Sequence, residues 1–249
     1  MLVLLPPSES KASGTDGPPL DLDALSFPAL TRTRAKLVKQ LVRLGRSRPR
    51  QLQAALGLSE RQRAEVDRDA ALLTAPTLPT MELYTGIVYD NLGYATLSGT
   101  ARERADASLV VASALFGLLR PGDRVPPYRL SGGTTLPTLG GLAPLWRPVL
   151  EKELRAQELV VDLRSGAYAN LARLPHAVVV RVLRDEGGLR TVVSHDNKWT
   201  KGQLARALCL EEVADLDDVA QVARTVADAV EVEGSRVDLL LHGLASART

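Results

Sequence analysis

Short apolar runs, separated by longer segments of mixed polarity, dominate the hydrophobic pattern of the chain. Runs of four to seven residues rich in leucine and β-branched residues predict buried strands. They occupy residues 2–5, 109–112, 159–163, 177–183, 189–194 and 237–241. Most of the intervening segments have helical patterns, and alternation of strands with helices is typical of an α/β fold.

The fourth and fifth runs differ from the others because only a short glycine-containing segment separates them. They form AVVVRVLRDEGGLRTVVSH, with Gly187 and Gly188 at the expected turn of an antiparallel hairpin. Strands separated by helices pair in parallel. The sequence therefore predicts an α/β fold with a mixed β-sheet, helices around it and one antiparallel hairpin. We expect residues 1–249 to form a single domain.

Residues 31–50 have the most uneven charge, with eight Lys or Arg and no acid. Their spacing predicts an amphipathic helix with Leu37 and Leu41 on its buried face and Arg34 as an exception on that face. The cationic stripe, at spacings of four, three and four, consists of Arg32, Lys36, Lys39 and Arg43. These four are the expected contacts to a DNA backbone.

Two shorter helices are predicted to follow. Pro49 suits the first turn of one, which Gly57 would end, and Ser59 with Gln62 forms a capping box for the next. The basic helical subregion is thus expected at about 28–74, followed by a linker at APTLPT (75–80). Residues 211–249 contain nine acids and three Arg, so the basic subregion is matched by an acidic region near the end of the sequence.

Other compositional features favour a cytoplasmic protein. Cys209 is the single cysteine, which excludes an intrachain disulfide, and a core position is the favoured interpretation over a reactive thiol. The apolar run at residues 1–5 is too short for a secretory signal, and no run approaches a membrane span. The three histidines are far apart, so the sequence gives no signal for a metal or other cofactor.

Polar motifs follow three of the predicted strands. The first strand runs into PPSESK, the second into SALFGLLRPGDRVPPYRLSGG and the third into RSGAY. Ligands of open α/β sheets bind at the carboxyl ends of strands. We therefore expect Ser8, Ser10 and Lys11 to face a bound anion with Ser113 nearby, after the two prolines have ended the first strand.

The central block contains two further candidate features. RPGD predicts a type II turn that holds Arg120 near Asp123, either at the site or as a turn-closing ion pair. Tyr128 and Arg129 follow two prolines and could present an aromatic ring and a planar fork to phosphate or base. A tyrosine packed at the sheet edge is the alternative.

A third candidate feature is the late segment HDNKWTKGQLARAL. Thr200 and Gln203 predict a capping box, which would place Lys198, Lys201 and Gly202 at a helix N-terminus. Free amides and two lysines favour an anion there. The alternative is a solvated helix start with surface lysines.

Taken together, these motifs closely resemble the YaaA family of peroxide-stress proteins. The resemblance is carried, in order along the chain, by PPSESK (6–11), TGIVYDNL (85–92), SALFGLLRPGDRVPPYRLSGG (113–133), DLRSGAY (162–168) and KWTKGQLAR (198–206). Three carboxylates of the family pattern are replaced here, at Ile87, Ser131 and Ala167. The retained basic residues are Lys11, Arg120, Arg129, Lys198, Lys201 and Arg206.

The resemblance implies a DNA-binding protein that limits free iron and oxidative damage, with a positively charged cleft and a helix-hairpin-helix element. Expected partners are double-stranded or structured DNA and a small anionic ligand. The expected ligand-binding residues are Ser8, Ser10, Lys11, Ser113, Arg120, Tyr128, Arg129, Lys198, Lys201, Gly202 and Arg206. Two alternatives stay open. One is an enzyme acting on a small phosphate- or nucleobase-bearing ligand, and the other is metal sequestration by Glu9, Asp90 and Asp123.

Overall fold

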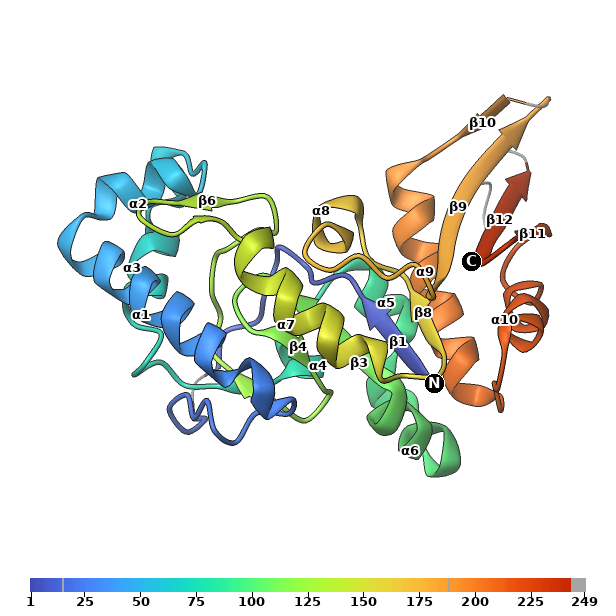
Figure 1. Cartoon of the computed structure of the whole chain (residues 1–249), viewed down its shortest axis with the longest axis horizontal. Coiled ribbons are helices and arrows are strands. Elements are labelled where there is room, and N and C mark those ends of the chain that lie inside the picture. The colour runs from blue at the N-terminus through green and yellow to red at the C-terminus, as the bar shows by residue number, and fades with distance from the viewer. Residues whose placement is uncertain (15, 188, 243–249) are drawn as a thin grey trace.

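A mixed β-sheet forms the centre of the protein in the computed structural model, which describes residues 1–14, 16–187 and 189–242 (Figure 1). The strand order is β11-β12-β9-β8-β1-β3-β4, and β10 pairs with β9 outside this path. The strands are β1 (Leu2–Leu5), β3 (Leu109–Ser113), β4 (Gly117–Leu119), β8 (Val160–Asp162), β9 (Val178–Glu186), β10 (Leu189–Thr191), β11 (Ala229–Glu233) and β12 (Arg236–His242). Two small ribbons accompany it, β2 (Leu78–Pro79) with β5 (Arg124–Val125) and β6 (Thr135–Leu136) with β7 (Gly140–Gly141).

The pairing confirms the predicted mixed sheet. β1 lies between β3 and β8, parallel to both, and β9 is parallel to β8 and β12. β10 is antiparallel to β9, as the hairpin pattern predicted, and Gly187 has a left-handed φ of 64°. Gly188 lies outside the described residues. The strands β4 and β11 were not predicted, because β4 is short and β11, AVEVE, has no buried residue and contains two glutamates.

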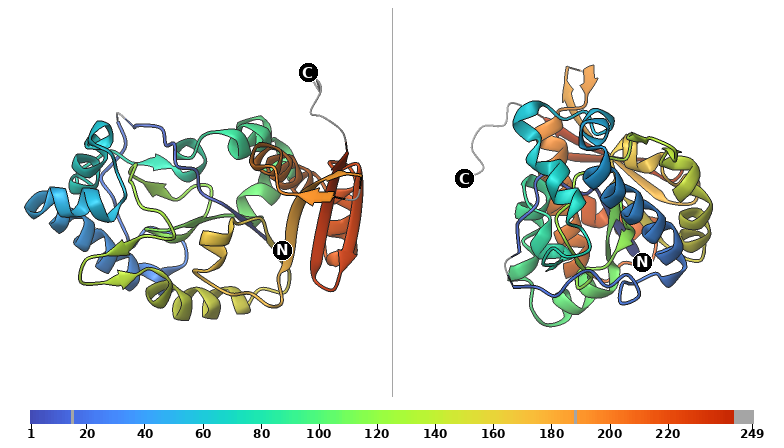
Figure 2. Two further views of the ribbon diagram at one scale, coloured as in Figure 1. Left: turned by 90° about the horizontal axis from the view of Figure 1, so that it is seen from above. Right: turned by 90° about the vertical axis from the view of Figure 1, so that its left-hand side faces the viewer.

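Helices cover both faces of the sheet. Seen from above in Figure 2, α5 (Ile87–Leu92), α6 (Gly99–Ser108) and α9 (Ser194–Leu210) lie on one face, and α7 (Ala143–Arg155) lies on the other. The remaining short helices are α4 (Thr80–Leu83), η3 (Tyr94–Thr96), α8 (Gly166–Ala169) and α10 (Leu216–Ala223). No helix within the described residues is long and apolar enough to cross a membrane.

The basic segment forms a helical subregion at one end of the molecule (Figure 1). It consists of η1 (Pro28–Leu30), α1 (Thr31–Ser47), α2 (Pro49–Ala55), η2 (Glu60–Gln62) and α3 (Ala64–Ala70). Pro49 lies in the first turn of α2, and Gly57 beyond its end has a left-handed φ of 64°, both as predicted. The capping box of Ser59 and Gln62 is also present, although it opens a 3-10 turn.

Arg34 anchors this subregion to the sheet. Its side chain is fully buried, Nε donates to the Phe116 carbonyl at 2.8 Å, and Nη2 donates to the Leu118 carbonyl at 2.7 Å. Burial lowers the pKa of the guanidinium to about 10. In the sequence, Arg34 is an exception on the apolar side of α1. In the structure, a cation lies there because its guanidinium donates to carbonyls beside and within β4.

Two sequence expectations are wrong. Residues 75–80 are no linker, because β2 and the start of α4 lie within them and the side chains of Thr77 and Thr80 are fully buried. RPGD forms no type II turn, because Gly122 lacks the positive φ that such a turn needs at its third position. By contrast, Cys209 is fully buried and burial raises the pKa of its thiol to about 11, so the core interpretation is confirmed.

We predict that Arg34→Ala lowers the free energy of unfolding by about 2–4 kcal/mol, because two buried carbonyls lose their donors and a void remains. Arg32→Ala is the matched control, since Arg32 is exposed on the same helix and should change stability by less than about 0.5 kcal/mol. Urea denaturation measures both. Equal effects would contradict the anchoring role of Arg34.

Candidate functional site

The polar motif after β1 closes on itself as a turn. The Ser8 hydroxyl donates to the Ser10 carbonyl at 2.5 Å and accepts from the Thr85 amide at 3.2 Å. The Lys11 ammonium donates to the carbonyls of Ser8 and Glu9 at 3.0 and 3.3 Å. The two prolines therefore end the strand as predicted, and the turn holds the Lys11 amine at the carboxyl end of β1.

Tyrosine rings surround the Lys11 amine. Its Nζ lies 4.4 Å from the centre of the Tyr128 ring and 5.5 Å from that of Tyr84. Such ring faces attract a cation, whereas burial and the charge of Arg129 oppose it. Burial is the larger effect, and together they lower the pKa of Lys11 to about 8.

The Tyr128 hydroxyl lies at the centre of a buried chain of hydrogen bonds. It pairs with the Tyr84 hydroxyl at 2.9 Å and with the Ser113 hydroxyl at 2.7 Å. Ser113 also accepts from the amides of Leu115 and Phe116, so its position at the end of β3 is fixed. Tyr128 is 1% exposed. It therefore does not present its ring to solvent, and the structure agrees with the alternative of a tyrosine packed at the sheet edge.

Asp69, on α3, is the main residue of this region that sequence reasoning missed. One carboxylate oxygen accepts the Arg129 amide at 2.8 Å, and the other, Oδ2, is buried without a hydrogen-bond partner in the described structure. Burial raises the pKa of this carboxyl to about 8. A signal was present, because Asp69 is three residues from both Val66 and Leu72, on the apolar face of its helix.

The charge of Arg129 acts on the Lys11 amine, and the Arg129 side chain is partly exposed. Both of its terminal nitrogens reach the same oxygen of Glu9, at 3.3 and 3.4 Å. The Glu9 side chain is 80% exposed, so this ion pair is weak and easily replaced. We name the Lys11 cluster as Glu9, Lys11, Asp69, Tyr84, Tyr128, Arg129 and Tyr168.

Tyr168 joins the cluster from α8. Burial raises the pKa of its hydroxyl to about 12, and the charges of Glu9 and Arg129 also act on it. A side chain at Gly132 would lie 2.9 Å from the Ala167 carbonyl, so this glycine allows the two loops to approach. Ser131 and Ala167, where the sequence lacks two family carboxylates, are thus close together beside the cluster, and both are exposed.

A buried lysine, Lys201, lies near the carboxyl end of β8. It donates to the Arg164 carbonyl at 3.4 Å, and Arg164 forms a buried ion pair with Asp162 at 2.7 Å. Burial lowers the pKa of Lys201 to about 8, against the opposing charge of Asp162.

The expected helix N-terminus at Thr200 is wrong. α9 begins at Ser194, six residues earlier, so Lys198, Thr200 and Lys201 lie inside a continuous helix whose amides are already paired. Gly202 has a packing role, because a side chain there would lie 2.4 Å from the Val88 carbonyl of α5. Arg206 donates to the carbonyls of Leu92 and Gly93 at the end of α5, and Lys198 is exposed.

Arg120 and Asp123 have structural contacts of their own. The Asp123 carboxylate accepts from the Arg120 amide at 2.8 Å and from the amide and hydroxyl of Ser26, both at 2.9 Å. The Arg120 side chain donates to the Ala107 carbonyl and lies over the ring of Phe27. Asp123 thus secures the N-terminal loop, and the Arg120 side chain packs outside the Lys11 cluster.

The structure therefore brings together about half of the residues expected at the site. Ser8, Lys11, Ser113, Tyr128 and Arg129 meet around the Lys11 amine, while Arg120, Lys198, Gly202 and Arg206 lie elsewhere. Sequence reasoning missed Tyr84 and Tyr168, which had no signal beyond their positions, Tyr84 directly before TGIVYDNL and Tyr168 at the end of DLRSGAY. Within the described ranges there is no group of three or more His, Cys, Asp or Glu that could hold a metal ion.

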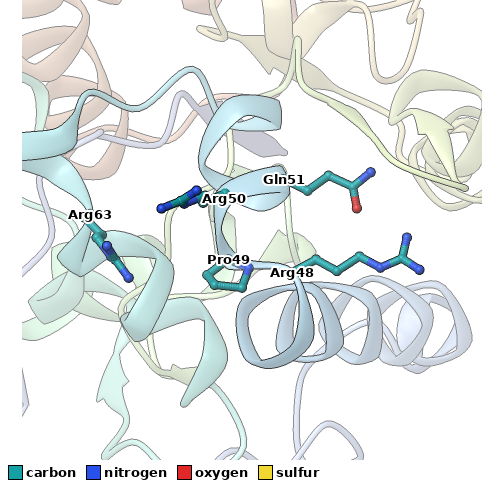
Figure 3. A pocket seen from close by; sticks show the side chains of 5 residues that line it. All are labelled: Arg48, Pro49, Arg50, Gln51 and Arg63. Atoms are coloured by element: carbon teal, nitrogen blue, oxygen red, sulfur yellow. The ribbon is translucent and has the colours of Figure 1, made fainter.

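The cationic stripe forms a separate exposed surface. Arg32, Lys36, Lys39 and Arg43 are all exposed on α1, as predicted. An open hollow beyond the end of α1 is lined by Arg48, Pro49, Arg50, Gln51 and Arg63. In Figure 3, Arg48 and Gln51 extend to one side of α2, and Arg50 and Arg63 lie on the other.

Comparisons with known proteins find similarity over most of the chain. Residues 1–226 match a family model described as peroxide stress protein YaaA. A UPF0246 protein of Corynebacterium efficiens is 43% identical over 248 residues, covering 96% of this chain and 98% of the relative. A UPF0246 protein of Streptomyces coelicolor is 41% identical over 259 residues, covering 97% and 99%.

We predict that Asp69 makes the protein less stable as the pH rises from about 4 to about 8. An unfolded Asp loses its proton near pH 3.9, whereas folded Asp69 keeps its proton up to about pH 8. Between these values the folded state binds more protons, so the free energy of unfolding falls as the pH increases. Asp69→Asn should therefore show a smaller fall between pH 5 and pH 8 in urea denaturation.

Asp67→Asn is the matched control, because Asp67 is exposed on the same helix. It should keep the pH dependence of the wild type. If Asp69→Asn also kept it, Asp69 would be ionised in the folded protein at neutral pH.

Proposed function

The chain belongs to the YaaA peroxide stress protein family, and we propose that it acts in the cytoplasm by binding double-stranded or structured DNA. The contacts are made to the DNA backbone by the exposed cations of the helical subregion. The role suggested by family membership, limiting free iron and oxidative DNA damage during peroxide stress, is part of this proposal.

The observation that carries the proposal is the charge of residues 31–63. This segment contains ten Lys or Arg and one acid, Glu60, and Arg34 is its only buried cation. The other nine are exposed and are Arg32, Lys36, Lys39, Arg43, Arg46, Arg48, Arg50, Arg61 and Arg63. Such a density of positive charge at one end of a protein favours binding of a polyanion.

Three of the four glutamines of residues 31–63, namely Gln40, Gln53 and Gln62, have hydrogen bonds within the protein, and the fourth, Gln51, is exposed. Gln40 donates to the Pro137 carbonyl, and Gln53 is mostly buried and donates to Glu60. No aromatic residue occurs between residues 31 and 63. Direct readout needs amide or forked donors fixed at base edges, whereas phosphate contact needs only charge. We therefore expect binding with little sequence preference.

A second candidate function is enzyme action on a small phosphate- or nucleobase-bearing ligand. The specific observation in its favour is that the partly buried Lys11 and the buried Lys201 both have a pKa lowered to about 8. Such groups gather at functional sites more often than elsewhere.

We predict that replacing Arg32, Lys36, Lys39 and Arg43 together by Ala weakens duplex binding and its dependence on salt. Each lost phosphate contact should reduce the slope of log affinity against log salt by about 0.9. Fluorescence anisotropy with a short duplex at several salt concentrations measures the slope.

The control variant removes four exposed cations elsewhere on the surface, namely Lys152, Arg155, Arg173 and Arg224. It changes the net charge equally and should keep the wild-type slope. If both variants had the same slope, the stripe would be a solvated helix face without a DNA contact.

A further inference from the structure

We propose that Lys11, Asp69 and Arg129 form a binding site for the phosphate group of a small phosphate monoester at the carboxyl edge of the sheet. The proposal concerns the ligand of the second candidate function and does not depend on duplex binding by α1. The three residues come from the loop after β1, from α3 and from the loop after β5, and each has a donor without a strong acceptor.

The Lys11 ammonium is a partly buried cation that forms no ion pair within the described residues. Its acceptors are two main-chain carbonyls, and the faces of Tyr84 and Tyr128 lie beside it. A partly buried ammonium without a counter-ion is unfavourable, and an anion that reaches its remaining N–H group relieves this.

Asp69 supplies a second donor. Its side chain is fully buried, and Oδ1 already accepts the Arg129 amide. Since the pKa of the carboxyl is raised to about 8, the acid keeps its proton at neutral pH. Oδ2 is the carboxyl oxygen without a partner, so a protonated acid has a free donor there for a ligand oxygen.

Arg129 supplies the third set of donors. Both of its terminal nitrogens share one oxygen of the exposed Glu9 at 3.3 and 3.4 Å, rather than pairing with two oxygens. A ligand that offers two oxygens to the guanidinium fork makes the stronger, bidentate arrangement. Glu9 thus occupies a position that an incoming anion can take.

A phosphate monoester fits this set of donors better than other ligands. It has three terminal oxygens and a charge of about −1.5 to −2 at neutral pH. With Asp69 protonated, the cluster has the positive charges of Lys11 and Arg129 against Glu9 alone, which disfavours a metal cation. A backbone phosphodiester has one charge and a sugar on each side, and so matches buried donors less well.

Isothermal titration calorimetry with ribose 5-phosphate and AMP tests the proposal, with ribose and adenosine as unphosphorylated controls. Lys11→Ala should weaken binding of both phosphorylated probes by about 10- to 100-fold. Lys152→Ala, which removes an exposed lysine of α7, should change it by less than about twofold. Arg129→Gln, which removes the guanidinium fork, should also weaken binding of both phosphorylated probes. It tests the site independently if Lys11→Ala folds poorly.

Asp69 gives a sharper comparison. Asp69→Asn keeps a donor at this position and should bind ribose 5-phosphate within about threefold of wild type at pH 7, whereas Asp69→Ala should bind about tenfold more weakly. In the wild type, affinity should fall about tenfold between pH 7 and pH 9, because near pH 8 Lys11 loses its positive charge and Asp69 loses its donor proton and becomes negative. The other charges that act on this pair are Glu9, Glu65, Arg68 and Arg129.

Two controls separate this site from the DNA surface. The quadruple α1 variant should bind ribose 5-phosphate as the wild type does, even if its duplex binding is lost. A duplex without terminal phosphates should not displace ribose 5-phosphate, and displacement would show that the site takes backbone phosphates instead. The proposal is overturned if ribose binds as well as ribose 5-phosphate, or if Lys11→Ala and Arg129→Gln both bind as wild type.

Discussion

The parallel pairing of β1 with both β3 and β8 is the constraint on which the rest of the structure depends. All four residues of β1 are buried, and its neighbours bond it in fixed register, with Val3 opposite Leu109 on one side and Val161 on the other. Parallel strands end at the same edge of a sheet. This register therefore brings the turn that holds Lys11, the end of β3 at Ser113 and the buried Asp162–Arg164 pair to one edge.

The helical subregion is joined to this edge by polar contacts as well as by the core. Arg34 of α1 donates to carbonyls beside and within β4, and Asp69 of α3 accepts an amide from the segment that contains Arg129. The exposed cations of α1 and the buried groups around Lys11 thus belong to one connected arrangement.

Four of the five tyrosines of the chain, Tyr84, Tyr89, Tyr128 and Tyr168, lie together at this edge, and burial raises the pKa of each, so all four are neutral. Their hydroxyls satisfy buried polar groups, and two of their rings face an ammonium. Tyr89 donates to the Pro6 carbonyl and so supports the turn after β1. A predominantly aliphatic core can hold a partly buried lysine here because these rings replace part of its hydration.

The sequence by itself determined the six main strands, the mixed sheet, the cationic stripe of α1 and the polar ends of β1 and β3, since each follows from local periodicity or from proline. It also identified Lys11 and Arg129, because prolines precede each of them in a polar motif. Only the tertiary structure decided which of these groups are buried and which meet. Thr200 had the local pattern of a helix start but lies inside α9, and of the two alternatives for Tyr128, a ring presented to a ligand or a ring packed at the sheet edge, the packed one is observed. The place of Asp69 on the apolar face of its helix indicated burial, but its hydrogen bond from the Arg129 amide and its proximity in charge to Lys11 join residues about 60 positions away in either direction. No local pattern encodes such pairings, because they depend on neighbours that are distant in the sequence.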